Sequence, residues 1–492
     1  MNRLRVKGRK IIDSQGNEIH LRGTCLGGWM NLENFINGFP GCESGLRRAM
    51  EEELGKKKSH YFFECLLDNF FTEGDAAYIS QIGANVVRVA LNYRHFEDDE
   101  RPFSYKDAGF RRLNSFLDLC EKYGLYVILD MHAAPGWQNA HWHSDNENAI
   151  SLFWQQRQYR ERLKGLWREI AGRYKDRSVV AGYELLNEPV TNTPAGDLPH
   201  MAFGNYKPRW KIMNSVYREL VDTIREIDID HIIFLEGDCY GQLFEGLDSP
   251  FADNLVYSSH AYSLAGFGPG VYPGRFNKMK TSEVANGGDY FDKEQQFNTF
   301  KHSSGVQFCE KNNVPLWIGE FGSQYNTGVL DVPYRLRAMD DQLAIYNEWG
   351  ANWTSWTYKD MGVMGVVTVN PKSEYAELIE PVQRMKTALG AENFVSWELD
   401  TPGKNANRAL AEVIRNIIGN DSPSLSDITA GLSLFALTGY AAACLQPSFC
   451  HLFREKEQED INRILSSFDL KNCVVNEPFE EILSMRLKEV NA

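Results

Sequence analysis

The chain lacks several features that mark common classes of protein. It has no excess of basic residues: the formal net charge is −14 at pH 7, so a polyanion such as nucleic acid would be repelled rather than attracted. It also has no internal repeat and no low-complexity linker to divide its 492 residues. With 43% hydrophobic and 24% charged residues, its composition is that of an ordinary globular protein. We expect no nucleic-acid partner.

The N-terminal segment lacks the pattern of a secretion signal. Residues 1–16 include basic side chains but no apolar core and no cleavage site of small residues. The nine cysteines are an odd number and lack the regular spacing of a disulfide framework. Both features favour a cytoplasmic protein with reduced thiols.

One uncharged stretch, residues 428–449, is long enough to cross a bilayer. Thr, Ser, Gly, Gln and Pro dilute its apolar content. We therefore expect a buried helix that packs on the rest of the protein, and no membrane partner. Cys444, Cys450 and His451 lie in or beside this stretch but lack the paired C-x-x-C spacing of zinc ligands, so we expect no metal site there.

Short apolar runs rich in β-branched residues alternate with longer segments of helical periodicity. The predicted strands are residues 19–26, 84–91, 126–132, 182–188, 231–236, 255–260, 316–320 and 353–357. Helical periodicity covers residues 110–122, 158–174, 210–227, 297–312 and 334–349, and a further helix over residues 376–389 completes the last crossover. Eight such alternations are what a closed parallel barrel requires, so the sequence predicts an α/β fold, a (β/α)8 barrel.

Two extensions flank the predicted barrel. Alternating runs around the turn cluster Ser14, Gln15, Gly16 and Asn17 predict an N-terminal β-hairpin. From about residue 420 the pattern is helical and shows no strand–helix repeat, which indicates an accessory helical layer. We therefore expect two domains: a barrel with its hairpin over residues 1–400, and a helical extension packed on it over residues 401–492.

The predicted strands end abruptly in polar or aromatic residues, as in YVILDMH, YELLNEP, LVYSSHAY, LWIGEFG and WTSWTY. In a (β/α)8 barrel the carboxyl ends of the strands face the active site, and a fully buried sheet has no other reason to finish this way. Glu188 and Glu320 stand at the ends of predicted strands four and seven. We expect both to point into one barrel mouth.

Two carboxyl groups that face each other across a pocket can hydrolyse a glycosidic bond. One donates a proton to the departing oxygen, and the other attacks, or assists attack, at the anomeric carbon. If the groups are about 5–5.5 Å apart, the second is a nucleophile and the anomeric configuration is retained. Like charges at that distance do not both ionise easily, so the two pKa values should differ.

The motifs around the two glutamates resemble those of glycoside hydrolase family 5. The resemblance rests on NEP after strand four, GEFG at strand seven, DMHAAPGWQN at strand three and WTSWTYKD at strand eight. The last two are most similar to the exo-β-glucanase and β-glucosidase branch of that family. The resemblance covers about residues 6–359 and implies a retaining β-glycoside hydrolase without a cofactor or metal. Glu188 would then be the acid/base and Glu320 the nucleophile.

The same resemblance implies roles for two residues close to the glutamates. Arg88 matches an arginine of strand two that hydrogen-bonds the nucleophile, and a guanidinium there lowers the pKa of the carboxyl group. Asn187 matches the residue that holds the 2-hydroxyl of the substrate, a contact that tightens in the transition state. A structural salt bridge and a turn before Pro189 are the respective alternatives.

Four further residues match the walls of the sugar site in that family. His132 matches a wall of the −1 subsite, His260 lies near the acid/base and Tyr262 near the nucleophile, and Trp356 matches the stacking floor. Packing at the barrel rim or in the core is the alternative for each, and Trp353 is the better candidate for a core tryptophan.

Residues outside these motifs carry weaker signals. Glu236 ends the fifth predicted strand and could bind a substrate hydroxyl or form a salt bridge at the rim. Trp29 follows the first predicted strand, and Trp137, Trp142 and His143 follow the third, so we expect them to line the mouth. Aromatic side chains there would form the aglycone or +1 site.

The substrate is expected to be a saccharide or other glycoside. Without a secretion signal, β-glucosides or short β-glucans are favoured over extracellular polymers. The insertions over residues 31–72 and 133–151 would close one end of the cleft and make the enzyme exo-acting. An endo-acting β-glucanase or β-mannanase of the same family is the alternative.

Two more distant functions also fit a barrel. A metal-dependent hydrolase could use His132, His260 and Glu320 as ligands, but such enzymes usually carry a histidine pair at the end of strand one, where this chain reads LRGTCLGGWM. A non-catalytic sugar-binding barrel would be expected to have lost a catalytic glutamate, and this chain has both.

Overall fold

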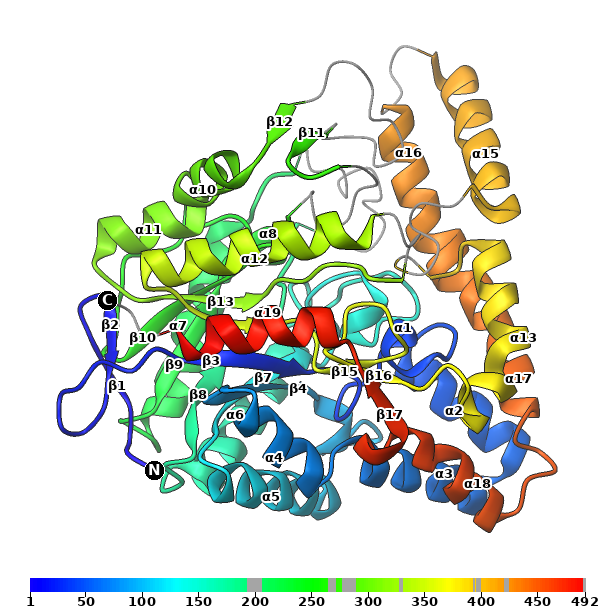
Figure 1. The fold of residues 1–492 in the computed structure, drawn as a ribbon, viewed down its shortest axis with the longest axis horizontal. Helices are drawn as coiled ribbons and strands as arrows, with labels where there is room; N and C mark the ends of the chain where they lie inside the picture. The colour runs from blue at the N-terminus through cyan, green and yellow to red at the C-terminus, as the bar shows by residue number, and fades with distance from the viewer. Residues whose placement is uncertain are drawn as a thin grey trace.

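The computed structural model describes residues 1–192, 206–263, 271–276, 289–326, 331–392, 394, 400–419 and 424–489. Its centre is a closed barrel of eight strands (Figure 1), in the order β10-β13-β14-β3-β4-β7-β8-β9. These strands are β3 (Arg22–Leu26), β4 (Val86–Asn92), β7 (Tyr126–Ala133), β8 (Val180–Glu184), β9 (Ile232–Glu236), β10 (Leu255–His260), β13 (Leu316–Glu320) and β14 (Asn352–Ser355). All adjacent pairs are parallel. Each strand overlaps a predicted one, which confirms the (β/α)8 fold.

The helices around the barrel follow the predicted periodicity with one exception. Four match closely: α5 (Asp107–Lys122), α6 (Arg157–Tyr174), α7 (Trp210–Arg225) and α12 (Val332–Trp349). The single helix predicted over residues 297–312 is wrong, because two helices, α10 (Lys293–Lys301) and α11 (Ser304–Asn312), occupy this region. The side chain of Ser303 accepts a hydrogen bond from the Val306 backbone N–H, and this cap starts the second helix.

The N-terminal hairpin closes the end of the barrel opposite the strand carboxyl ends. It consists of β1 (Arg5–Lys7) and β2 (Lys10–Ile12), which are antiparallel. Its strands are joined by a turn at Gly8, which was not predicted and whose φ of 58° suits glycine. The turn predicted around residues 14–17 is also present: the Asp13 N–H donates to the Asn17 carbonyl at 2.9 Å, and Ile12 and Glu18 form an isolated bridge. Leu4 and Ile11 pack with buried residues at the amino ends of the barrel strands.

The insertion after β3 is helical. It contains α1 (Asn34–Asn37), α2 (Glu43–Leu54) and α3 (Lys56–Phe70), and α4 (Glu73–Gln81) then leads back to the barrel. Smaller elements on the loops are β5 (Glu97–Asp98), β6 (Arg101–Tyr105), α8 (Asp238–Gly241), β11 (Gly274–Phe276), β12 (Asp289–Phe291) and β15 (Lys359–Asp360).

A long apolar helix runs along one side of the molecule (Figure 1, orange). It is formed by α16 (Leu425–Leu432), the π-helix η5 (Ser433–Ala441) and α17 (Ala442–His451). By length and composition it could cross a membrane, and only 33% of its most apolar window is buried. It packs against α2, α13 (Glu374–Leu389) and α15 (Pro402–Ile418). The prediction of a buried helix here is thus correct for one face only.

The chain returns to the barrel after α18 (Gln458–Leu465). Strand β17 (Cys473–Val475) pairs antiparallel with β16 (Val367–Val369), so the tail is not purely helical. The last helix, α19 (Glu477–Lys488), packs on α12, and its Ser484 hydroxyl donates to the Ile82 carbonyl at the end of α4.

Helix α19 therefore lies between the helices that follow β13 and β3, where the eighth helix of such a barrel belongs (Figure 1). The helix predicted for this place, residues 376–389, corresponds to α13, which packs on α15 and α17 instead. The division of the chain near residue 400 stays a prediction.

Candidate active site

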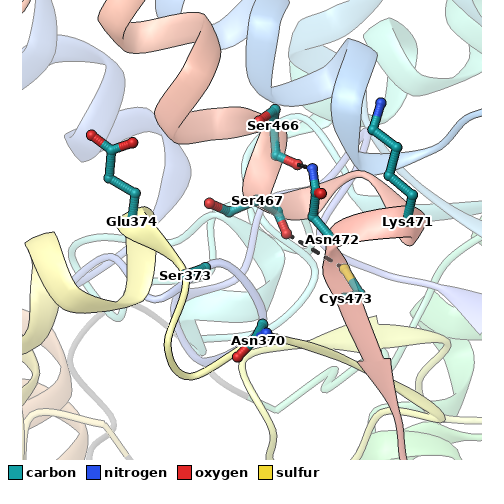
Figure 2. Close-up of a pocket in the computed structure, with 8 residues that line it drawn as sticks. All are labelled: Asn370, Ser373, Glu374, Ser466, Ser467, Lys471, Asn472 and Cys473. Carbon is teal, nitrogen blue, oxygen red and sulfur yellow. Dashed lines mark hydrogen bonds between the residues drawn. The ribbon is translucent and has the colours of Figure 1, made fainter.

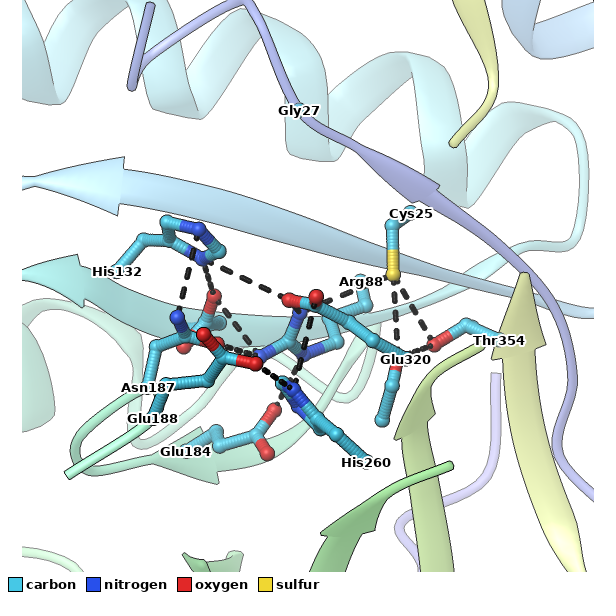
Figure 3. Close-up of polar contacts among 12 residues, drawn as sticks. Cys25, Gly27, Arg88, His132, Glu184, Asn187, Glu188, His260, Glu320 and Thr354 are labelled. Carbon is cyan, nitrogen blue, oxygen red and sulfur yellow. Dashed lines mark hydrogen bonds and ion pairs between the residues drawn. The ribbon is translucent and has the colours of Figure 1, made fainter. Parts of the chain in front are cut away.

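Glu188 and Glu320 meet at the carboxyl end of the barrel (Figure 3). Glu320 is the last residue of β13, as predicted. Glu188 does not end a strand, because β8 stops at Glu184, and its backbone has a φ of 47°. One carboxylate oxygen of Glu188 and one of Glu320 lie within 4.8 Å of each other. This separation agrees with the 5–5.5 Å between carboxyl groups in retaining glycosidases.

Two histidines hold the carboxyl group of Glu188, one on each oxygen. The Nδ1 atom of His260 lies 2.8 Å from Oε1, and the Nε2 atom of His143 lies 3.2 Å from Oε2. Burial and the neighbouring histidines lower the pKa of His143 well below its usual range, so its ring is neutral at ordinary pH. His143 therefore lies in the site itself, closer to the reacting groups than a position lining the mouth.

Glu320 is held in its ionised form. Arg88 donates to its Oε1 at 2.7 Å, and the Tyr262 hydroxyl donates to its Oε2 at 2.9 Å. Burial alone would raise the pKa of Glu320, but the His260 ring, Arg88 and His132 together outweigh it and lower the pKa to about 2. A nucleophile must be ionised, and this one is.

Arg88 organises the floor of the site and has no solvent exposure. Besides Glu320, its guanidinium pairs with Glu184 at 2.6 Å and Asp130 at 3.1 Å, and it donates to Oδ1 of Asn187 at 2.7 Å. Arg88 thereby connects strand β4 to the side chains that follow β8 and β13. These contacts fit the positions predicted for Arg88 and Asn187.

His132 forms one wall of the site and stacks on Trp356, with ring centroids 5.2 Å apart and an interplanar angle of 4°. Its Nδ1 lies 2.8 Å from Asp130, and its Nε2 lies 3.2 Å from Glu33. Burial lowers the pKa of His132, but Asp130, Glu33 and Glu320 outweigh it and raise the pKa to about 10. His132 is thus positively charged at neutral pH, a few ångströms from the nucleophile.

Of the four other tryptophans named from the sequence, Trp29, Trp142 and Trp353 are buried and Trp137 is partly buried. Trp142 packs edge-on against Phe35 at 5.9 Å, between the insertions that follow β3 and β7. Trp137 donates through Nε1 to the Asp145 carbonyl and is only partly buried. Trp353 is a core residue, as predicted. Trp29 does not line the mouth: it is 3% exposed and donates to the Leu67 carbonyl of α3.

Glu236 is the last residue of β9 and contacts the backbone of Glu188. It has no solvent exposure, and its Oε2 accepts the backbone N–H of Glu188 at 2.9 Å. Its burial argues against a salt bridge at the rim, and a bond to a substrate hydroxyl stays a prediction.

Sequence reasoning missed three acidic residues of the site. Asp130 and Glu184 lie on barrel strands, two and four residues before His132 and Glu188, so the two-residue period of a strand could have placed them on the inner face. Glu33 lies in the insertion after β3, and nothing in its local sequence links it to His132. Burial raises the pKa of Glu33 to about 7, with His132 opposing the rise.

Two groups of possible metal ligands lie close together among the described residues: Glu188, His260 and Glu320, and Glu184, Glu236 and His260. The set proposed for a metal-dependent hydrolase, with His132 in place of Glu188, is not one of them. Both ring nitrogens of His132 face carboxylates, those of Asp130 and Glu33.

A polar pocket lies elsewhere, where the start of α13 meets β17 (Figure 2). It is lined by Asn370, Ser373, Glu374, Ser466, Ser467, Lys471, Asn472 and Cys473. None of these residues belongs to the site around Glu188 and Glu320. All nine cysteines of the chain, Cys473 among them, are free. The cytoplasmic location that they suggested stays a prediction.

The barrel, the facing glutamates and the ionised nucleophile define a glycoside hydrolase. Residues 59–362 match the model of the cellulase family, glycosyl hydrolase family 5. The chain belongs to this family, as its motifs suggested.

The proteins that this chain resembles are named for different activities. A "Beta-xylosidase" of Phanerodontia chrysosporium is 32% identical over 502 residues, which cover 98% of this chain and 97% of the relative. An "Endoglucanase C" of Acetivibrio thermocellus is 26% identical over 346 residues, 65% of this chain and 93% of the relative. The crystal structure of an endogalactoceramidase shares the fold, with a TM-score of 0.50, 16% identity and coverage of 73% of this chain and 75% of that one.

Proposed function

We propose that the protein is a retaining, exo-acting β-glycosidase that removes single terminal sugars from β-glucosides, β-xylosides or short β-linked oligosaccharides. The observation that carries the mechanism is the approach of a Glu188 oxygen to within 4.8 Å of a Glu320 oxygen. At this separation the second carboxylate reaches the anomeric carbon itself, with no space for an intervening water molecule.

The first step forms a bond between Glu320 and the sugar. The Glu320 carboxylate attacks the anomeric carbon, and the bond to the glycosidic oxygen breaks as Glu188 donates its proton to that oxygen. Glu320 enters the reaction ionised, because Arg88 and Tyr262 donate to its two oxygens. The product of this step is a glycosyl ester of Glu320, and the aglycone leaves.

The second step releases the sugar. Glu188, now a carboxylate, removes a proton from a water molecule that attacks the anomeric carbon, and the ester bond to Glu320 breaks. Two inversions restore the β configuration. The positive charges of Arg88 and His132, close to Glu320, favour its departure as a carboxylate.

Contacts between the two insertions support an exo-acting pocket. The backbone N–H of Ser44 donates to Asp145 at 2.7 Å, and Asn31 donates to the His143 carbonyl at 3.1 Å. The insertion after β3 is thereby joined to the loop after β7, whose His143 contacts Glu188. A wall built from both insertions stands at one side of the catalytic pair, where an endo-acting enzyme needs an open cleft.

Similarity along the chain also favours exo action. The relative named a beta-xylosidase matches nearly the full length, including the C-terminal helices, whereas the endoglucanase matches 65% of the chain. Glucose and xylose differ only in the hydroxymethyl group on C5, so both remain candidates for the −1 subsite.

Two measurements test this proposal. Aryl β-glucosides and β-xylosides are hydrolysed while proton NMR records the first-formed anomer, and we expect the β anomer; an initial α product would exclude retention. Oligosaccharides labelled at the reducing end should shorten by one sugar at a time, whereas early internal fragments would show endo action.

A further inference from the structure

We propose that Glu236 is a positioning residue that stays protonated and holds the acid/base Glu188 at two points. One point is the Glu188 backbone, and the other is the Glu188 side chain, which Glu236 reaches through His260. This inference rests on the proposed role of Glu188 and adds a residue that acts without touching the substrate.

The first point of contact is direct. Oε2 of Glu236 accepts the backbone N–H of Glu188 at 2.9 Å. Glu188 lies beyond the end of β8 with a φ of 47°, a conformation that a residue other than glycine adopts only when its surroundings impose it. The hydrogen bond to Glu236 of β9 is one such constraint, because it fixes the backbone from which the Glu188 side chain projects.

The second point of contact passes through a histidine. Oε1 of Glu236 faces Nε2 of His260 at 3.5 Å, and within the described part of the chain neither atom has a hydrogen-bond partner. Two buried acceptors that face each other repel unless a proton lies between them. The other ring nitrogen, Nδ1, lies 2.8 Å from Oε1 of Glu188. His260 thus links the side chain of Glu236 to that of Glu188 through its two ring nitrogens.

One proton is shared by Glu236 and His260. The local charges favour the carboxyl group of Glu236 as the group that carries it. Glu236 has no solvent exposure and is surrounded by Glu184, Glu188, His260 and Arg88. The guanidinium of Arg88 forms ion pairs with Glu184, Asp130 and Glu320, and not with Glu236. Burial, followed by the charges of Glu184 and Glu188, raises the pKa of Glu236 well above its usual range.

A neutral Glu236 determines which nitrogen of His260 carries a hydrogen. The Glu236 hydroxyl, on Oε1, donates to Nε2, so the ring hydrogen of His260 is on Nδ1 and donates to Oε1 of Glu188. Oε2 of Glu188, which faces His143, is then the oxygen that carries the catalytic proton. The same Nδ1–H lies 3.6 Å from Oε2 of Glu320 and also favours the ionised nucleophile.

Two substitutions separate this role from a general loss of structure. E236L keeps the approximate volume but removes both contacts. E236Q keeps both, because its amide N–H can donate to Nε2 of His260 while its carbonyl accepts the Glu188 N–H. E245Q, an exposed glutamate in the loop after β9, is the matched surface control. The readouts are the dependence of kcat/KM on pH and on the leaving group.

For E236L we expect kcat/KM to fall about 100-fold for aryl glycosides with poor leaving groups, the lower end of the contribution of a general acid. Dinitrophenyl glycosides, which need no proton, should lose less than about tenfold on the same reasoning. The basic limb should also shift, because Glu236 no longer determines which ring nitrogen of His260 carries the hydrogen that faces Glu188. The titratable groups that face Glu188 are His143, His260, Glu320 and Glu236, and only the last is changed.

E236Q should restore most of the activity and return the basic limb to its wild-type position. Equal losses on both classes of leaving group would overturn the proposal, and so would an E236Q profile that matches E236L. E188Q, measured alongside, must itself show the leaving-group effect; its absence would refute the acid/base role of Glu188 rather than that of Glu236.

A measurement on the wild-type enzyme decides the matter if E236L does not fold. In protein with 15N-labelled imidazole rings, His260 should show a protonated Nδ1 and an unprotonated Nε2, with H260N used for assignment. A protonated Nε2 would overturn the proposal.

Discussion

Arg88 donates a hydrogen bond to Oε1 of Glu320 over 2.7 Å, from a position with no solvent exposure. The same guanidinium also holds Asp130 and Glu184, which a single lysine ammonium cannot do in this geometry.

We therefore expect R88K to raise the pKa of Glu320 and to move the acid limb of kcat/KM to higher pH. Buried carboxylates left unpaired should also cost about 3–5 kcal/mol of stability. The pH profile with an aryl glycoside and thermal denaturation measure the two effects. A folded R88K enzyme with an unmoved acid limb would contradict this account of Glu320.

Removal of the nucleophile should abolish normal turnover and open another reaction. E320A leaves space beneath the anomeric carbon, so turnover should fall by several orders of magnitude. Added azide should enter that space and give an α-glycosyl azide by a single inversion. The configuration of the azide product, read by NMR, is the check. A β-azide would instead identify Glu320 as the acid/base.

Removal of the acid should discriminate between leaving groups. E188Q should lose about 10²–10⁴-fold in kcat/KM on alkyl glycosides, the usual contribution of a general acid. Dinitrophenyl glycosides should still form the glycosyl ester, visible as a burst of phenolate. A comparable loss on both substrates would mean that Glu188 does not donate the proton.

The pKa of two site residues predicts how stability varies with pH. For His132, burial lowers the pKa, but Asp130 and Glu33 outweigh it and raise the pKa from 6.5 to about 10. Its contribution to stability is therefore complete below pH 6.5 and lost as the pH rises toward 10. For Glu320, His260 and Arg88 overcome burial and lower the pKa from 4.5 to about 2, so its contribution is complete above pH 4.5 and lost toward pH 2.

The melting temperature should consequently be highest between about pH 4.5 and 6.5. H132Q should flatten the alkaline side of that curve only, and E320Q the acid side only. Thermal denaturation across the pH range measures both. An alkaline decline that persists unchanged in H132Q would show that other groups cause it.

The last helix should be necessary for the barrel to fold. Phe479 of α19 is 1% exposed and lies 5.1 Å from the ring of Tyr325, in the segment after β13. F479A should cost about 3–5 kcal/mol, as is usual for a buried phenylalanine. E481A, at an exposed position of the same helix, is the control. Urea denaturation measures both; a stability loss below about 1 kcal/mol for F479A would mean that α19 is peripheral.

Much of the barrel could be predicted because its signals are local. An apolar β-branched run such as VVRVALN is buried on every side in β4, and a strand is what so short a run can form. The polar residue at the end of such a run, Glu320 in LWIGE, is then placed at the mouth by the direction of the strand alone.

The predictions of element boundaries were wrong where the local sequence signal was weak or ambiguous. The turn at Gly8 was missed because its neighbours, Lys7 and Arg9, are not turn-forming residues, whereas the cluster at residues 14–17, which also forms a turn, consists of them. Residues 297–312 have an unbroken apolar period, and only the cap at Ser303 divides them. Glu188 was placed on a strand because YELLNEP reads as one apolar run, whereas the chain leaves β8 at Glu184.

Residue types and their spacing along the chain were thus enough to establish the eight strands, the end of the barrel that carries the chemistry and the two glutamates that face each other there. The partners of Glu33 and Glu236 and the position of α19 were decided by the tertiary structure alone. Each of them depends on contacts between segments far apart in sequence: Glu33 with His132, Glu236 with Glu188, and α19 with the end of α4. Periodicity reports which face of an element is buried, but only closure of the barrel determines which partner lies against it.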